Sequence, residues 1–120
     1  MGTARFDKKP DLPYDGAALG NQISGTISAG PCELLEFAAK NNAAAVRYLF
    51  FQNRVAPAAG QPANNYLPVP VPAGGTASDE VQIRFTTGLS WMSSTTDLLA
   101  TATAAADMIV TARVRQLVSP

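Results

Sequence analysis

Short runs of alternating apolar and polar residues recur along the chain from about residue 21 onward. The clearest is residues 80–85, in which Val81, Ile83 and Phe85 alternate with polar residues, as in a half-buried strand with one wet face. Residues 44–53 form the strongest apolar run, and their aromatic content favours a strand over a helix segment. Clusters of Gly, Pro, Asn and Ser separate the runs as turn signals. We therefore expect strands over residues 22–28, 32–39, 44–53, 67–72, 80–85, 89–93 and 107–118, with a strand and a loop together over 98–107.

Seven or eight short strands at roughly even spacing predict an all-β chain. We expect an antiparallel β-sandwich or a jelly-roll-like domain over residues 21–120. Residues 1–20 differ from the rest, because they carry many charges, prolines and glycines and show no helical or strand period. We predict that they form an extended N-terminal arm outside the core.

One expected strand contains three prolines at alternate positions. Prolines and aliphatic residues alternate through Leu67, Pro68, Val69, Pro70, Val71 and Pro72. In an extended chain the three prolines lack their N–H groups along the same edge, so the segment can pair along one edge only. The sequence predicts an edge strand that is protected against further pairing, with the aliphatic side chains inward and the proline rings outward. A polyproline ligand and a plain loop are the alternatives.

Composition bears on partners. The chain has 120 residues, enough for one domain, and 15% of them are charged, against about 25% in an ordinary soluble domain. Such a surface resists association poorly, which suggests that partners cover much of it, although a low-charge monomer is the alternative. The nine basic and nine acidic residues cancel, so we expect no nucleic-acid partner. No 18-residue apolar run or signal-peptide pattern is present, so we expect no membrane association and no secretion.

Residues for catalysis are scarce. The sequence has no histidine, and Cys32 is its single cysteine, which we expect to be a buried free thiol. Arrangements of Ser or Cys with His are therefore impossible, and a zinc site would need carboxylates alone. Glu33 and Glu36 are three residues apart and should face opposite ways on a strand, as should Asp79 and Glu80. We expect no enzymatic activity, no cofactor, no metal and no small-molecule substrate.

Aromatic residues offer one binding alternative. A carbohydrate-binding face could be built from Tyr48, Phe50, Phe51, Tyr66 and Trp91. Core packing is the more common use of such residues.

Three stretches taken together carry a resemblance: residues 40–53 (KNNAAAVRYLFFQN), 67–75 (LPVPVPAGG) and 81–96 (VQIRFTTGLSWMSSTT). In this order they resemble a small β-domain of tailed-bacteriophage virion structural proteins. The resemblance covers about residues 31–114 and leaves out the charged arm. It implies a structural role in the virion, and its motifs do not distinguish the capsid surface from the neck or the tail.

We therefore expect a non-enzymatic virion protein made in the host cytoplasm, most simply a capsid decoration or cement protein that binds the major capsid protein in many copies. It would form a symmetric homo-oligomer, for which a trimer is one choice. Its arm would lie across a neighbouring subunit, with anchors at Phe6, Leu12 and Tyr14 and with register set by Lys8, Lys9 and Asp11. A neck or tail protein of the same fold is one alternative, and a carbohydrate-binding β-sandwich using Trp91 or Tyr66 is another.

Overall fold

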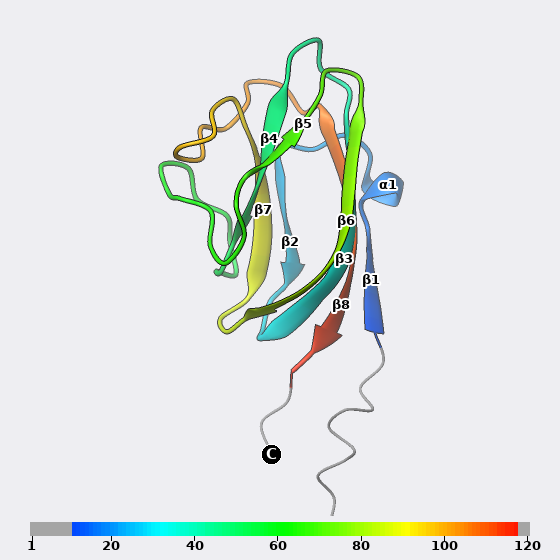
Figure 1. Cartoon of the computed structure of the whole chain (residues 1–120), viewed down its shortest axis with the longest axis vertical. Coiled ribbons are helices and arrows are strands. Elements are labelled where there is room, and N and C mark those ends of the chain that lie inside the picture. The colour runs from blue at the N-terminus through cyan, green and yellow to red at the C-terminus, as the bar shows by residue number, and fades with distance from the viewer. Residues whose placement is uncertain (1–10, 118–120) are drawn as a thin grey trace, which may run out of the picture.

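The computed structural model describes residues 11–117, which form two four-stranded antiparallel sheets packed face to face (Figure 1). Sheet A has the order β1-β8-β3-β6, and sheet B has the order β2-β7-β4-β5. The predicted all-β sandwich is therefore confirmed. The strands are β1 (Asp11–Asp15), β2 (Ser24–Ser28), β3 (Cys32–Asn41), β4 (Arg47–Gln52), β5 (Val69–Val71), β6 (Thr76–Phe85), β7 (Leu89–Ser94) and β8 (Met108–Gln116), and one helical turn, α1 (Gly16–Leu19), follows β1.

The strand order is that of a jelly roll. Neighbours in the sheets are β1 with β8, β2 with β7, β3 with β6 and β4 with β5. This nested pairing results when one long antiparallel hairpin is rolled up so that successive pairs fall alternately in sheet A and sheet B. Of the two architectures that the sequence left open, the eight-stranded jelly roll is the one found.

The core lies between the sheets and consists of the inward-facing residues of alternating strands. Trp91 and Phe51 of sheet B meet Leu34 and Phe85 of sheet A there, and each is at most 1% exposed. Burying a side chain of this size contributes about 1.5–3 kcal/mol. In the part of the chain that the structure describes, no helix has the length and apolarity needed to cross a membrane.

A β-bulge in β3 corrects the expected facing of its residues. Leu34 pairs with Val114 of β8, and Glu36 pairs with the very next residue, so Leu35 is an extra residue in β3. Leu34 and Phe37 are both buried, and the two residues between them lie on the outer side. Simple alternation placed Phe37 opposite Leu34, and this was wrong because a bulge resets the parity of a strand.

The domain begins earlier than predicted. Residues 11–15 were assigned to the arm, but they pair in antiparallel register with β8, from Asp11 opposite Arg115 to Asp15 opposite Thr111. The expected boundary after residue 20 is therefore wrong. Pro13 hid this strand in the sequence, yet β1 is the first strand of sheet A, and an edge strand tolerates proline. Residues 1–10 lie outside the described part of the chain.

The proline-rich segment is an edge strand, but a short one. Only Val69–Val71 forms β5, which pairs with β4 and ends the order of sheet B. Val71 is buried and Val69 packs partly against the core, as predicted, whereas Leu67 is 82% exposed. The inward position predicted for Leu67 is wrong, because the segment pairs with β4 only from Val69 onward. Pro70 and Pro72 are exposed and Pro68 is partly buried.

Two long loops cover the outer face of sheet B, on the left of Figure 1. Residues 53–68 follow β4 and residues 95–107 follow β7. The second loop contains no strand, only an isolated bridge between Ser94 and Ala102, so the strand expected within 98–107 is not there. The buried residues of this segment, Ala100, Thr103 and Asp107, are three and four residues apart, which does not match the period of two of a strand.

The loops lie over a second small core. Phe50 and Met92 point outward from sheet B and pack with Ala100 of the second loop. The buried side chain of Gln52 acts as a strand partner for the first loop: its amide donates to the carbonyl of Ala58 at 2.9 Å and its oxygen accepts from the N–H of Ala58 at 2.8 Å. The loops also bond to each other, from the N–H of Gly60 to the carbonyl of Ala100 at 2.7 Å.

Candidate functional site

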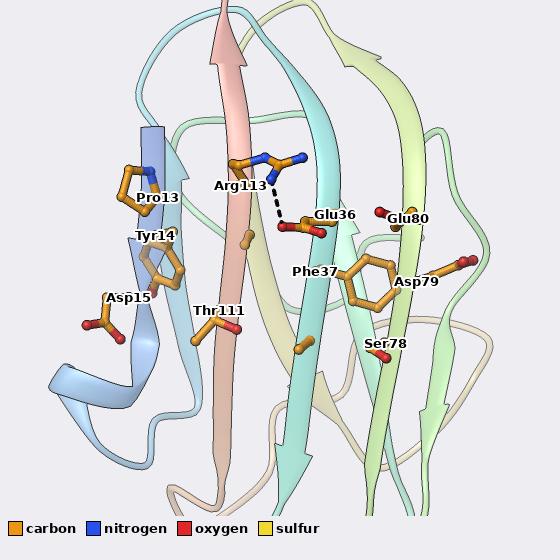
Figure 2. A pocket seen from close by; sticks show the side chains of 12 residues that line it. Pro13, Tyr14, Asp15, Glu36, Phe37, Ser78, Asp79, Glu80, Thr111 and Arg113 are labelled. Atoms are coloured by element: carbon orange, nitrogen blue, oxygen red, sulfur yellow. Dashed lines mark ion pairs between the residues drawn. The ribbon is translucent and has the colours of Figure 1, made fainter. Parts of the chain in front are cut away.

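The outer face of sheet A differs from that of sheet B, because no loop among residues 11–117 lies over it. A shallow depression of ≈ 680 Å³ crosses all four of its strands (Figure 2). We call it the sheet A depression. Eight residues face it from the outer side: Pro13, Asp15, Glu36, Ala38, Ser78, Glu80, Thr111 and Arg113. Their alternate neighbours in the lining, Tyr14, Phe37, Asp79 and Ala112, direct their side chains toward the core side.

Small side chains form the floor of the depression. Ala38 of β3 lies opposite Ser78 of β6 on one side and opposite Thr111 of β8 on the other. Because three short side chains stand in one row across the sheet, the surface sinks there. The next row, with Lys40 and Ile109, borders a second hollow of ≈ 310 Å³ that shares this floor. The result is a broad trough in the middle of an uncovered sheet.

A charged row borders the floor. Arg113 of β8 lies opposite Glu36, and its Nη1 is 3.1 Å from Glu36 Oε1. On the far side of Glu36 stands Glu80 of β6. Like charges directly opposite each other are unfavourable, and Arg113 offsets this for Glu36. Together with Asp15 the outer side of the depression has three carboxylates and one guanidinium, and Asp79 adds a fourth carboxylate to the lining, so the depression is acidic.

This site was not predicted from the sequence. Glu33 and Glu36 were expected on opposite faces, and this was wrong, because the bulge at Leu35 puts both on the outer face, opposite Arg115 and Arg113. One signal was available in the sequence: the apolar positions of β3 change their spacing from two residues to three between Leu34 and Phe37. Asp79 and Glu80 do face opposite ways, as predicted.

The residues predicted as arm anchors fall in different places. Phe6, Lys8 and Lys9 lie outside the described residues. Asp11 and Leu12 are part of β1, where they pair with Arg115 and Val114.

Tyr14 makes contacts within its own domain. The indole N–H of Trp91 donates to its hydroxyl at 3.2 Å, and its ring packs against the main core. Gly25 of β2 makes room for this contact, since a Cβ there would lie 2.5 Å from the Tyr14 hydroxyl oxygen. Tyr14 thus fastens β1 across the sandwich to β7, and its role as a partner anchor stays a prediction.

The aromatic residues do not form an exposed sugar-binding face. Trp91 and Phe51 are 1% exposed and Phe50 is fully buried. Tyr66 packs edge-on against Phe37 and Phe51, with ring centroids 5.9 and 6.4 Å away. Its hydroxyl donates to Asp79 Oδ2 at 2.8 Å, which raises the pKa of Tyr66. The ring closes the gap between the two sheets beside β6.

Cys32 is a buried free thiol, as predicted. Burial raises its pKa, because the thiolate would lose its hydration. Among residues 11–117, no cluster of three or more His, Cys, Asp or Glu side chains could hold a metal ion.

A buried polar cluster closes the end of the sandwich away from the start of β1. The side-chain amide of Asn41 donates to the carbonyls of Ala45, Val71 and Pro72 at 2.8, 3.0 and 3.2 Å, and its oxygen accepts from the N–H of Ala43 at 2.8 Å. One side chain thus joins the β3–β4 connection to the end of β5. Because its hydrogen bonds are all to backbone groups, we assign the cluster to structure and not to chemistry.

Nearby, Arg47 Nε lies 3.2 Å from Asp107 Oδ2, and both side chains are at most 20% exposed. The pair fastens β4 to the residue before β8.

Comparison with protein-family models, with curated proteins and with solved structures gives no match. The site therefore has to be interpreted from its own geometry.

Proposed function

We propose that this chain is a non-enzymatic structural protein of tailed-bacteriophage virions, and specifically a capsid decoration or cement protein that binds the capsid lattice in many copies. The observation that carries the proposal is the uncovered outer face of sheet A. In the part of the chain that the structure describes, one side of the sandwich is closed by loops, and the other is an open four-stranded sheet with a small-residue trough and a charged border. A broad, shallow surface of this kind suits a protein partner better than a small molecule, which needs an enclosing pocket.

The fold supports the proposal by analogy. Eight-stranded jelly rolls occur in viral capsid domains, lectins and cupins. A metal site with His ligands, of the kind found in non-haem iron enzymes, cannot form in this chain, because it has no His. Fold alone does not determine function. The analogy therefore reduces the number of candidate functions and does not select one of them.

The lectin alternative has less support. Trp91 is enclosed in the core, and the ring of Tyr66 is engaged with Phe37, Phe51 and Asp79. Trp91 is therefore not accessible for sugar stacking, and Tyr66 borders only a shallow hollow with Leu67 and Pro68.

The motifs behind the phage resemblance have structural positions that suit a rigid building block. Residues 40–53 contain the Asn41 cluster and β4, and residues 67–75 contain the edge strand β5. Residues 81–96 contain the end of β6 and all of β7, the most buried strand.

The test is to find the chain in an intact particle. Antibodies raised against the recombinant protein would be used for immunogold labelling of purified phage particles, and the chain would be quantified per particle by mass spectrometry with isotope-labelled peptides. We expect label over the whole capsid shell and many copies per particle. Absence from purified particles would contradict a virion role, and label confined to the neck or tail would contradict the decoration assignment.

A matched pair of variants tests the face itself. Ser78→Trp fills the floor of the sheet A depression, whereas Gln82→Trp places the same side chain farther along the outer side of β6. When recombinant protein is added to particles that lack it, Ser78→Trp should co-sediment less than wild type and Gln82→Trp should co-sediment normally. Equal binding by both variants would show that this face is not used.

A further inference from the structure

We propose that the sheet A depression binds the N-terminal segment, residues 1–10, of a second copy of this chain. The inference deepens the proposed function, on which it rests for the presence of many copies side by side. On the lattice the depression then contacts a neighbouring copy, and Ser78→Trp weakens binding to particles by weakening this contact between copies. It assigns the depression a partner of known sequence, and it gives a role to the part of the chain that precedes β1.

Charge is the first argument. Residues 1–10, MGTARFDKKP, carry Arg5, Lys8 and Lys9 against Asp7, a balance of three positive charges and one negative. The outer side of the depression has the opposite balance, three carboxylates and one guanidinium. Complementary charges of this kind steer association and fix the register of a docked segment.

Shape is the second argument. The floor residues Ala38, Ser78 and Thr111 belong to three adjacent strands, which are about 4.8 Å apart. The row therefore spans about 10 Å across the sheet. An extended chain lying on the trough fits this width, and the small side chains allow its backbone to approach the sheet.

The direction of β1 favours a second copy over the chain's own segment. β1 enters sheet A at Asp11, opposite Arg115, at the end of the sheet where β8 finishes (Figure 1). From there it runs toward the depression, which it lines with Pro13 and Asp15. The N-terminal end of β1 thus points away from its own depression.

Reach is sufficient for an adjacent copy. Ten residues span at most about 33–36 Å when extended, and a four-stranded sheet is about 15 Å across. Such a contact is heterologous, segment to depression, so it forms a ring when the rotation between copies closes.

Sedimentation velocity of the full chain over a range of concentrations tests the proposal. Wild type should self-associate, and Glu80→Lys should associate about three- to tenfold more weakly, because one attraction is replaced by a repulsion. Gln82→Lys is the matched control, with the same added charge on the same strand outside the lining, and it should associate as wild type does. Raising the NaCl concentration should weaken association of wild type more than that of Glu80→Lys.

A charge exchange identifies the partner. The double variant Lys8→Glu, Lys9→Glu should also lose self-association. Mixing it with Glu80→Lys should restore association between the two proteins, since the reversed segment then meets a reversed depression. Two results would overturn the proposal. One is that the mixture of the two variants does not associate, although a single chain with Lys8→Glu, Lys9→Glu and Glu80→Lys does. The other is that Glu80→Lys associates as strongly as wild type.

The docking of the N-terminal segment and the virion role can be contradicted independently of each other. A wild-type chain that is found on the capsid shell but remains monomeric at all concentrations would overturn the segment docking and leave the virion role intact. A chain that self-associates through the depression but is absent from particles would do the reverse.

Discussion

At the scale of single residues, the side chain of Asn41 makes four hydrogen bonds inside the sandwich. It is fully buried, and it satisfies three carbonyls and one N–H from two connections far apart in the sequence. Buried carbonyls that lose their donor cannot recover it from water, so the cluster depends on this one amide.

We predict that Asn41→Ala lowers the free energy of unfolding by about 2–3 kcal/mol, because it leaves buried carbonyls without a donor. Urea denaturation followed by tryptophan fluorescence measures the change. Asn42→Ala is the control, since Asn42 is exposed and its side-chain amide donates to the exposed oxygen of Asn21, and it should cost less than about 0.5 kcal/mol. Equal effects of both substitutions would contradict the role given to Asn41.

Tyr66 gives a prediction about pH. The hydrogen bond to Asp79 holds the pKa of Tyr66 above its usual value of about 10. Near and above pH 10 the unfolded chain loses this proton more readily than the folded one, so stability falls as the pH rises. Below pH 10 the contribution is fully present.

Tyr66→Phe should therefore lose about 0.5–1.5 kcal/mol at pH 7 and should show a shallower loss of stability than wild type between about pH 9.5 and 11. Urea titrations at a series of pH values measure both effects. Parallel pH profiles for the two proteins would show that the hydrogen bond to Asp79 is not what raises the pKa.

At the scale of elements, β5 illustrates how an exposed edge is protected. It pairs with β4 on one side only, and Pro70 stands at its centre, opposite Tyr48. A proline has no N–H to offer, so a further strand cannot pair fully along β5.

We predict that Pro70→Val leaves the unfolding free energy within about 0.5 kcal/mol of wild type but raises the rate of aggregation, because a new N–H group becomes available at the strand. Static light scattering at elevated protein concentration follows the aggregation. Pro62→Val, in the loop between β4 and β5, is the control and should aggregate as slowly as wild type. A destabilised Pro70→Val protein would instead mean that the ring packs within the domain.

Most strands could be predicted from the sequence, and the exceptions have physical causes. The inward orientation of Val81, Ile83 and Phe85 could be predicted, because apolar and polar residues alternate strictly in a half-buried strand. Strand β1 could not be predicted, because its five residues, with a proline at the centre, are too few to show an alternation of apolar and polar positions. The bulge in β3 was missed since a rule of period two has no place for an extra residue.

The candidate site could not be predicted from the sequence for a further reason. Its floor and border come from four strands that are far apart in the chain, and only the sheet order β1-β8-β3-β6 makes them neighbours. Ala38, Ser78 and Thr111 have no individual signal of function. Their significance appears only when they stand in one row.

At the scale of the whole molecule, the two faces of the sandwich have different roles. Sheet A is open, and sheet B is closed by loops that lie on Phe50 and Met92. The loops are therefore held by a core of their own, which should be separable from the main core.

We predict that Phe50→Ala speeds amide hydrogen exchange at Gly60 and Ala100, whose N–H groups bond across the two loops, more than it speeds exchange in β3. Phe51→Ala is the matched control, because Phe51 is adjacent in the sequence and faces the main core. Each change should cost about 3–5 kcal/mol, but Phe51→Ala should affect both regions alike. Uniform acceleration in Phe50→Ala would contradict a separate loop core.

The nested pairing of the strands also sets the order in which the fold can form. Leu49 and Val69 meet across 20 residues, whereas Asp11 and Arg115 meet across 104. Closing the longer loop costs about 1.5 kcal/mol more in chain entropy than closing the shorter one. At about 5–20 residues per second, roughly 5–20 s separate the synthesis of β1 from that of β8. The first strand to leave the ribosome is therefore the last to find its partner, and the jelly roll closes from its innermost hairpin outward.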